Sequence, residues 1–178
     1  MINFANILTI ARILAIPPLV VLMLSTHPMT AWAAFVLYAC IAMTDWLDGF
    51  VARNYNQQSE FGRFLDPIAD KILVAAMFLI LCASGAIGGW WLALPIIIMT
   101  REFLVSGLRE FLGPKGVVVH VTKLAKWKTT AQMVALGVLT LAPAVENAGT
   151  GGLYLLLLAT VLTVITGWDY LRSAKGHF

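Results

Sequence analysis

Four aspartates set in apolar sequence are the residues of this chain best suited to chemistry: Asp45, Asp48, Asp66 and Asp70. Asp45 and Asp48 are three residues apart, and Asp66 and Asp70 are four apart, which on a helix places each pair on one face, about one turn apart. A short connection separates the two pairs, so the two faces can meet. A carboxylate in a membrane-spanning helix costs roughly 2.5 to 3.5 kcal/mol on insertion scales. We therefore expect the four carboxylates to converge on a functional site.

Such a site needs cations, because four converging carboxylates repel one another and otherwise become partly protonated. Oxygen ligands without cysteine or histidine favour Mg²⁺ or Mn²⁺ over zinc. Two such ions roughly 3.5 to 4 Å apart would clamp the oxygens of a phosphorus under attack and of its leaving group. In the alternative interpretation the aspartates only pair with Arg53, Arg63 and Lys71. That alternative leaves the neighbouring glycines unexplained.

Small residues and one arginine accompany the aspartates. Gly49 directly follows the first pair, and Gly62 lies four residues before Asp66. Without side chains, both positions let a flat base or a phosphate approach the backbone, although Gly49 alone is also compatible with helix packing. Ala52 and Arg53 follow at the same end, and a guanidinium can grip a diphosphate through paired hydrogen bonds.

The elements that position these residues are predicted to be membrane-spanning helices. Of the 178 residues, 60% are hydrophobic and 12% charged, whereas soluble domains are about half apolar and a quarter charged. Apolar runs of about 20 residues must be helical in a bilayer, because hydrocarbon leaves no partner for free backbone groups. We predict an all-α polytopic membrane protein, a single domain over residues 1–178 with six transmembrane helices in one bundle. The predicted spans are 5–25, 31–53, 66–84, 90–111, 123–143 and 151–172.

The basic residues predict how these helices are oriented. The connections near 26–30, 85–89 and 144–150 contain no lysine or arginine, so the positive-inside rule places them outside and both termini in the cytoplasm. The aspartate pairs then flank a cytoplasmic connection. No block of basic residues interleaved with aromatics suggests a nucleic-acid partner.

A second polar set lies at the cytoplasmic ends of the fourth and fifth predicted spans. Its cations suggest an anionic substrate, because a phosphate inside a partly dry pocket is stabilised by charge-assisted hydrogen bonds. Arg101 interrupts an apolar run, which is costly unless the residue has a function. In the alternative interpretation these cations anchor the inner leaflet and Glu102 pairs with Arg109. The candidate residues for binding the anionic substrate are Arg101, Arg109, Lys126 and Lys128.

The aspartate region resembles the signature of the CDP-alcohol phosphotransferase family at every fixed position and interval. The matching residues are Asp45, Asp48, Gly49, Ala52, Arg53, Gly62, Asp66 and Asp70. The resemblance implies that the four aspartates hold two metal ions and that Asp70 is also the general base acting on an incoming hydroxyl. It further implies a site for the CDP moiety bordered by Asp48, Gly49, Ala52, Arg53, Gly62 and Asp66.

Nearly the whole chain is also similar to one branch of this family, the bacterial phosphatidylglycerophosphate synthases. The similarity covers Asn6 to Thr9 with Arg12 and Pro17, the pairs Arg101-Glu102 and Arg109-Glu110, and the segment from Lys126 to Gln132. It implies transfer of a phosphatidyl group from CDP-diacylglycerol to sn-glycerol 3-phosphate at a bacterial cytoplasmic membrane, by a homodimer. Asn6 and Arg12 are candidates for the nucleotide pocket, with helix capping and interfacial anchoring as alternatives.

Three other interpretations are open at this stage, and one of them, a purely structural membrane protein, does not require four aspartates at a helix hairpin. A family member making cardiolipin, phosphatidylserine or an inositol lipid would keep the aspartates and change the acceptor pocket. An ion-coupled transporter could use buried carboxylates as a relay. The transporter would distribute its charges through the membrane depth and commonly shows repeated halves, whereas here the charges gather at one side and no repeat is visible.

Overall fold

The computed structural model describes residues 4–55, 60–113 and 123–174. Side chains within these ranges are not described at 4–6, 45–55, 60, 61, 63, 64, 66, 123 and 174. Six long helices and one 3₁₀ turn make up the described chain, which contains no strand. They are α1 (Phe4–Met23), α2 (Pro28–Tyr55), α3 (Glu60–Ala83), η1 (Gly89–Leu92), α4 (Ala93–Leu112), α5 (Lys123–Thr140) and α6 (Ala148–Ala174). The prediction of an all-α protein is confirmed for this part of the chain.

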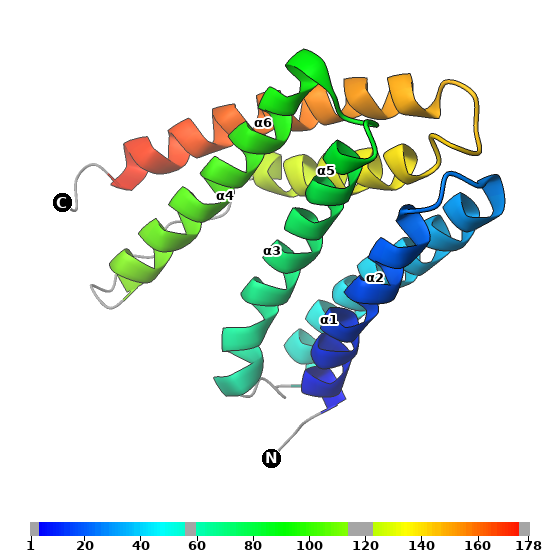
Figure 1. Cartoon of the computed structure of the whole chain (residues 1–178). Coiled ribbons are helices and arrows are strands. Elements are labelled where there is room, and N and C mark those ends of the chain that lie inside the picture. The colour runs from blue at the N-terminus through cyan, green and yellow to red at the C-terminus, as the bar shows by residue number, and fades with distance from the viewer. Residues whose placement is uncertain (1–3, 56–59, 114–122, 175–178) are drawn as a thin grey trace.

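The helices form two groups that meet along α5 (Figure 1). The α1–α2 hairpin packs with α3 on one side, while α5 and α6 form an antiparallel pair against which α4 lies. Helix α2 joins the groups by packing on α5, where the Tyr38 hydroxyl donates a hydrogen bond to the Met133 carbonyl oxygen at 3.0 Å. The shared core includes Leu19, Met77, Leu81 and Leu136.

The connections that lack basic residues lie together at one end of the molecule. The α1–α2 turn, the end of α3 and the α5–α6 turn line a common cavity of about 540 Å³. The start of α1, the end of α2 and the start of α3 lie at the opposite end (Figure 1).

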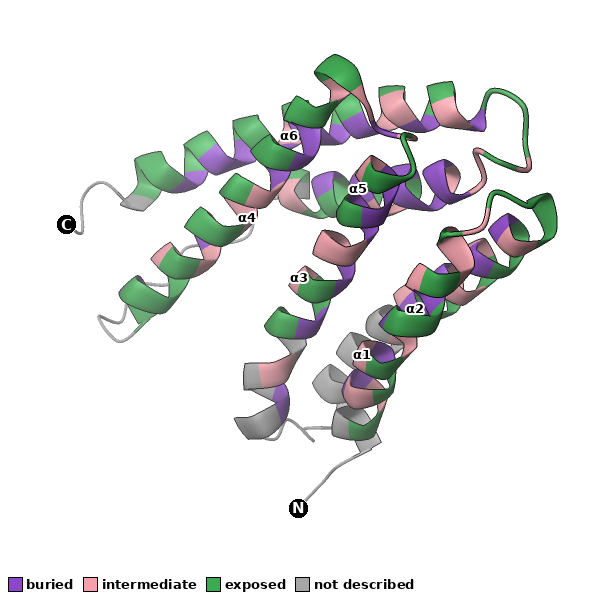
Figure 2. Ribbon diagram, in the orientation of Figure 1, coloured by how far each residue is buried: buried purple, intermediate pink, exposed green. Residues whose placement is uncertain are grey.

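The outer faces of the helices are exposed (Figure 2), and many of the exposed residues are large and hydrophobic. Leu14, Val21, Leu79 and Ile96 are exposed, and Trp90 is 96% exposed. Soluble monomers rarely present such extensive apolar surface. Within the described residues, Gly89–Leu112 and Ala148–Ser173 are long and apolar enough to cross a membrane, and Ile7–Met23 and Pro28–Thr44 are shorter apolar helices.

Glycines allow α5 to approach α6 and α2 closely. A Cβ atom at Gly152 would lie 2.7 Å from Leu139 Cγ and 3.2 Å from the Leu139 backbone nitrogen. Gly137 likewise faces the Tyr38 ring, where a Cβ would lie 3.3 Å from Cε1. Small residues allow this close helix packing without strain.

The Gly152→Ala substitution should therefore destabilise the α5–α6 pair. Overpacking of this kind costs about 1 to 3 kcal/mol, and the effect is measurable as a lower thermal transition in detergent. Gly151→Ala is the matched control, because no described atom lies within 4 Å of a Cβ there. Alanine is the better helix former by roughly 1 kcal/mol, so this control should be neutral or stabilising. Equal transitions for the two variants would contradict the close-packing argument.

Candidate active site

The two aspartate pairs lie on neighbouring helices. Asp45 and Asp48 belong to α2, and Asp66 and Asp70 belong to α3. Pro67 stands between the α3 aspartates and cannot donate the backbone hydrogen bond expected there. Asp70 is the one signature aspartate whose side chain is described. The predicted convergence of all four carboxylates involves side chains outside the described residues.

Asp70 is held by an arginine from another helix. Arg12 of α1 donates from Nη1 to Asp70 Oδ1 at 2.9 Å. The Arg12 side chain is 1% exposed and that of Asp70 is 53% exposed. Such a charge-assisted bond fixes one side of the carboxylate. The sequence made Arg12 a candidate for the nucleotide pocket, but its contact with Asp70 could not be read from the sequence.

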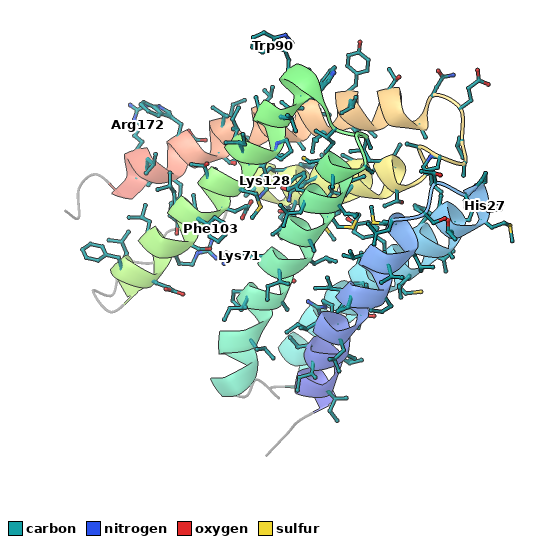
Figure 3. The ribbon with its side chains drawn as sticks, viewed as in Figure 1. His27, Lys71, Trp90, Phe103, Lys128 and Arg172 are labelled. Atoms are coloured by element: carbon teal, nitrogen blue, oxygen red, sulfur yellow. The ribbon has the colours of Figure 1, made fainter. Side chains whose placement is uncertain are left out.

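A cavity of about 200 Å³ opens beside Asp70, between α3, α4 and α5. We call it the Asp70 cavity. Lys128, which the sequence predicted to bind an anionic substrate, lines this cavity together with the predicted base Asp70. The labelled Lys71 and Lys128 lie in the middle of the molecule, whereas His27, Trp90 and Arg172 lie at its edges (Figure 3). The cavity is lined by Asp70, Lys71, Leu73, Val74, Met99, Glu102, Lys128, Thr129, Gln132 and Met133.

A carboxylate shared by two cations forms one wall of this cavity. The buried Lys128 donates from Nζ to Glu102 Oε1, and Arg101 Nη1 lies 3.6 Å from the same oxygen. Asp70 and Glu102 supply two negative charges to the lining and Lys71 and Lys128 supply two positive charges, so the formal charges of the lining cancel. Glu102 thus pairs with Lys128 and Arg101, and not with Arg109 as the alternative interpretation supposed.

The other predicted anion-binding residues occupy different positions. Arg101 extends toward α6, where Nη2 donates to Thr166 Oγ1 at 3.3 Å and its Cγ fills the space beside Gly167. Arg109 also contacts α6, with Nε donating to the Tyr170 hydroxyl at 3.5 Å. Lys126 is exposed. The structure brings Lys128 to the Asp70 cavity and places the two arginines between α4 and α6.

The remaining predicted CDP-binding residues lie near the ends of α2 and α3. Gly49, Ala52 and Arg53 fall on α2, within the stretch whose side chains lie outside the described residues. Gly62 lies in the first turn of α3 and is buried. Asn6 belongs to α1, and its side chain is likewise outside the described part.

The donor set suits a hard divalent cation. Asp70 offers a half-exposed carboxylate, and the signature supplies three further aspartates and no cysteine or histidine, which matches the preference of Mg²⁺ and Mn²⁺ for oxygen. Among the side chains that the structure describes, no three of histidine, cysteine, aspartate and glutamate form a cluster. Three of the four proposed ligands lie outside those side chains.

The helical fold and the complete aspartate signature agree with the family comparison. The model of the CDP-alcohol phosphatidyltransferase family matches residues 2–167, and the chain belongs to this family. It is 41% identical to the CDP-diacylglycerol--glycerol-3-phosphate 3-phosphatidyltransferase of Cereibacter sphaeroides, over 98% of this chain and 96% of the relative. Relatives of the same name from Rickettsia bellii and Salmonella choleraesuis are each 41% identical, over 99% and 98% of this chain and 97% and 96% of their own lengths.

The shared carboxylate gives a prediction about stability. Glu102→Gln removes the charge that neutralises Lys128 and part of that of Arg101, so the free energy of unfolding should fall by about 1.5 to 3 kcal/mol, the contribution of a hydrogen bond to a charged group. The measurement is thermal unfolding in detergent. Glu110→Gln, an exposed position on the same helix, is the control and should leave the transition unchanged. A Glu102→Gln transition at the wild-type temperature would show that the contact contributes little.

Proposed function

We propose that this protein transfers the phosphatidyl group of CDP-diacylglycerol to sn-glycerol 3-phosphate, giving phosphatidylglycerol phosphate and CMP in phospholipid biosynthesis. The observation that carries the proposal is the near-full-length similarity to relatives bearing the corresponding name. The family match over residues 2–167 and the intact eight-residue signature support the same chemistry. Membership of this family argues against the transporter alternative.

The reaction centre is proposed at Asp70. Its carboxylate faces the Asp70 cavity and is half exposed, so it can accept the proton of an acceptor hydroxyl as general base. Arg12 holds Oδ1 through its 2.9 Å bond, which limits rotation of the carboxylate. The deprotonated oxygen then attacks the phosphorus that carries diacylglycerol, and CMP leaves.

The signature supplies the cation site for this step. Asp45, Asp48, Asp66 and Asp70 would hold two divalent cations, Mg²⁺ or Mn²⁺, which neutralise diphosphate charge when bound. Asp48, Gly49, Ala52, Arg53, Gly62 and Asp66 would border the CDP moiety. The spacing of these residues on α2 and α3 supports both assignments.

The acceptor is proposed to occupy the Asp70 cavity. At about 200 Å³ it is smaller than the roughly 300 to 1,000 Å³ of pockets for drug-sized ligands, and it suits a small polar molecule better than a lipid or a nucleotide. Lys128 can meet the phosphate of sn-glycerol 3-phosphate. The positive electrostatic potential at the acceptor site is proposed to come also from Arg101, Arg109 and Lys126.

The protein is further proposed to cross the bacterial cytoplasmic membrane six times, with both termini and the active site in the cytoplasm. Two apolar helices of spanning length and the exposed apolar surface support a membrane location. The gathering of three basic-free turns at one end supports the alternation. A homodimer in the lipid bilayer is proposed from the family resemblance.

The function is tested with purified protein, CDP-diacylglycerol, Mg²⁺ or Mn²⁺, and a panel of acceptors. The panel contains sn-glycerol 3-phosphate, serine, inositol phosphate and phosphatidylglycerol, and the products are identified by mass spectrometry. We expect phosphatidylglycerol phosphate and CMP from the first acceptor. Preferential turnover of another acceptor would reassign the protein within its family. Full turnover in EDTA after exhaustive metal removal would contradict the proposed two-metal site.

Asp70→Asn should abolish most turnover while keeping the side-chain volume. Loss of a general base is worth typically 10² to 10⁴ in rate, and a ligand charge is lost as well. The rate of CMP release measures the effect. Asp169→Asn, an exposed position on α6, is the control and should retain wild-type turnover. Near-normal turnover of Asp70→Asn would move the role of base to another group, with Asp66 the first candidate.

A further inference from the structure

Gln132 is a buried polar residue that neither the signature nor the cation set explains. Its residue exposure is 4%, and it lines the Asp70 cavity. Its side-chain oxygen Oε1 is buried and has no hydrogen-bond partner among the described residues. Buried polar atoms are nearly always hydrogen-bonded, so we expect this oxygen to accept a hydrogen bond from a bound molecule.

The hydrogen bonds that the structure gives to the donors on the wall of the cavity go to acceptors other than Gln132. Lys128 donates to Glu102, and Lys71 Nζ donates to the Pro67 carbonyl oxygen at 3.3 Å. The Thr129 hydroxyl donates to the Ala125 carbonyl oxygen at 3.2 Å. The two carboxylates of the cavity, when ionised, only accept hydrogen bonds. None of these donors is hydrogen-bonded to Gln132 Oε1, so a molecule that enters the cavity can supply a donor to this oxygen.

The chemistry of that donor is restricted by the acceptor itself. An ionised phosphate oxygen cannot donate a hydrogen bond, and the hydroxyl that attacks phosphorus gives its proton to Asp70. A second hydroxyl on the same molecule can donate to Gln132. Gln132 lies four residues after Lys128 on α5, about 6 Å along the helix axis. Consecutive turns of α5 thus offer a cation and a hydrogen-bond acceptor to one short molecule.

We propose that Gln132 Oε1 accepts a hydrogen bond from the non-reacting hydroxyl of the acceptor, and that Gln132 thereby selects a diol phosphate over a mono-alcohol phosphate. This inference rests on the proposed function and adds a specificity-determining residue to it. The hydrogen bond orients the acceptor so that its terminal hydroxyl meets Asp70. An acceptor without the second hydroxyl leaves Oε1 unpaired in a buried position.

The test compares two acceptors that differ by one hydroxyl group. These are sn-glycerol 3-phosphate and 3-hydroxypropyl phosphate, which lacks the middle hydroxyl. Leaving a buried acceptor atom unpaired should lower kcat/KM for the second compound roughly 5- to 150-fold in the wild type. In Gln132→Met the ratio of the two efficiencies should fall toward one, through loss of activity with the diol, while KM for CDP-diacylglycerol stays unchanged.

Two further variants separate recognition from packing. Gln132→Glu keeps an accepting oxygen, so it should retain the preference for the diol. Its added negative charge should weaken the binding of both phosphate-bearing acceptors alike. Thr130→Val is the matched control on α5, because the Thr130 hydroxyl is already bonded to the Lys126 carbonyl oxygen at 3.1 Å and the residue is exposed. It should keep both the wild-type ratio and the wild-type rate.

The possible outcomes distinguish a failure of the inference about Gln132 from a failure of the proposed function. A wild-type enzyme that does not turn over sn-glycerol 3-phosphate overturns both. A wild-type enzyme that uses the two acceptors equally overturns the inference alone, as would a folded Gln132→Met variant with the wild-type ratio. The wild-type ratio needs no variant, so the inference stays testable even if Gln132→Met fails to fold.

Discussion

The cost of holding charge inside an apolar helical bundle is the constraint on which the rest of this structure depends. The buried cations offset this cost by pairing with carboxylates on other helices. Arg12 joins α1 to α3 through Asp70, and Lys128 joins α5 to α4 through Glu102. Because apolar packing is largely non-directional, these directional contacts help to fix how the helices face one another. The same contacts that neutralise charge therefore shape the cavity beside Asp70.

Helix α4 illustrates this coupling between stability and site geometry. One of its neighbouring charged residues, Glu102, contacts α5, while the other, Arg101, reaches α6 through Thr166. The close approach of Arg101 to Gly167 shows that a small residue on α6 makes room for the arginine stem. Stem and charge are accommodated separately, which is how long cationic side chains are usually placed in apolar surroundings.

The sequence predicted what depends on local pattern and missed what depends on distant contacts. All six helices were located, because apolar runs and turn residues are local signals. Helix α3 begins at Glu60, before the predicted start at 66, since hydropathy detects the apolar part of a helix and polar turns continue beyond it. Helix α5 ends at Thr140 rather than near 143, shortly before Pro143, which disfavours helical backbone at the preceding residue. The four-aspartate site stays a prediction from spacing, because three of its side chains lie outside the described residues.

The pairings around the site could not be read from the sequence for a physical reason. Arg12 and Asp70 are 58 residues apart, and Glu102 and Lys128 are 26 apart. Several cations compete for each carboxylate at such separations, and only the packing of the helices selects one. Gln132 was noted beside the predicted cations, yet nothing local to α5 shows that its oxygen is buried without a partner. Such a residue becomes informative only when its surroundings are known.

The position of Lys128 along α5 has a consequence for how two very different reactants meet. It is the sixth residue of the helix, about 8 Å along the axis from the first. If α5 spans as proposed, this is the depth of a lipid headgroup, well short of the hydrocarbon midplane. A water-soluble acceptor would then descend only through the headgroup layer, and a lipid donor would keep its acyl chains in hydrocarbon. Neither reactant would have to change phase, so the barrier to their encounter would be diffusion within each phase rather than transfer between them.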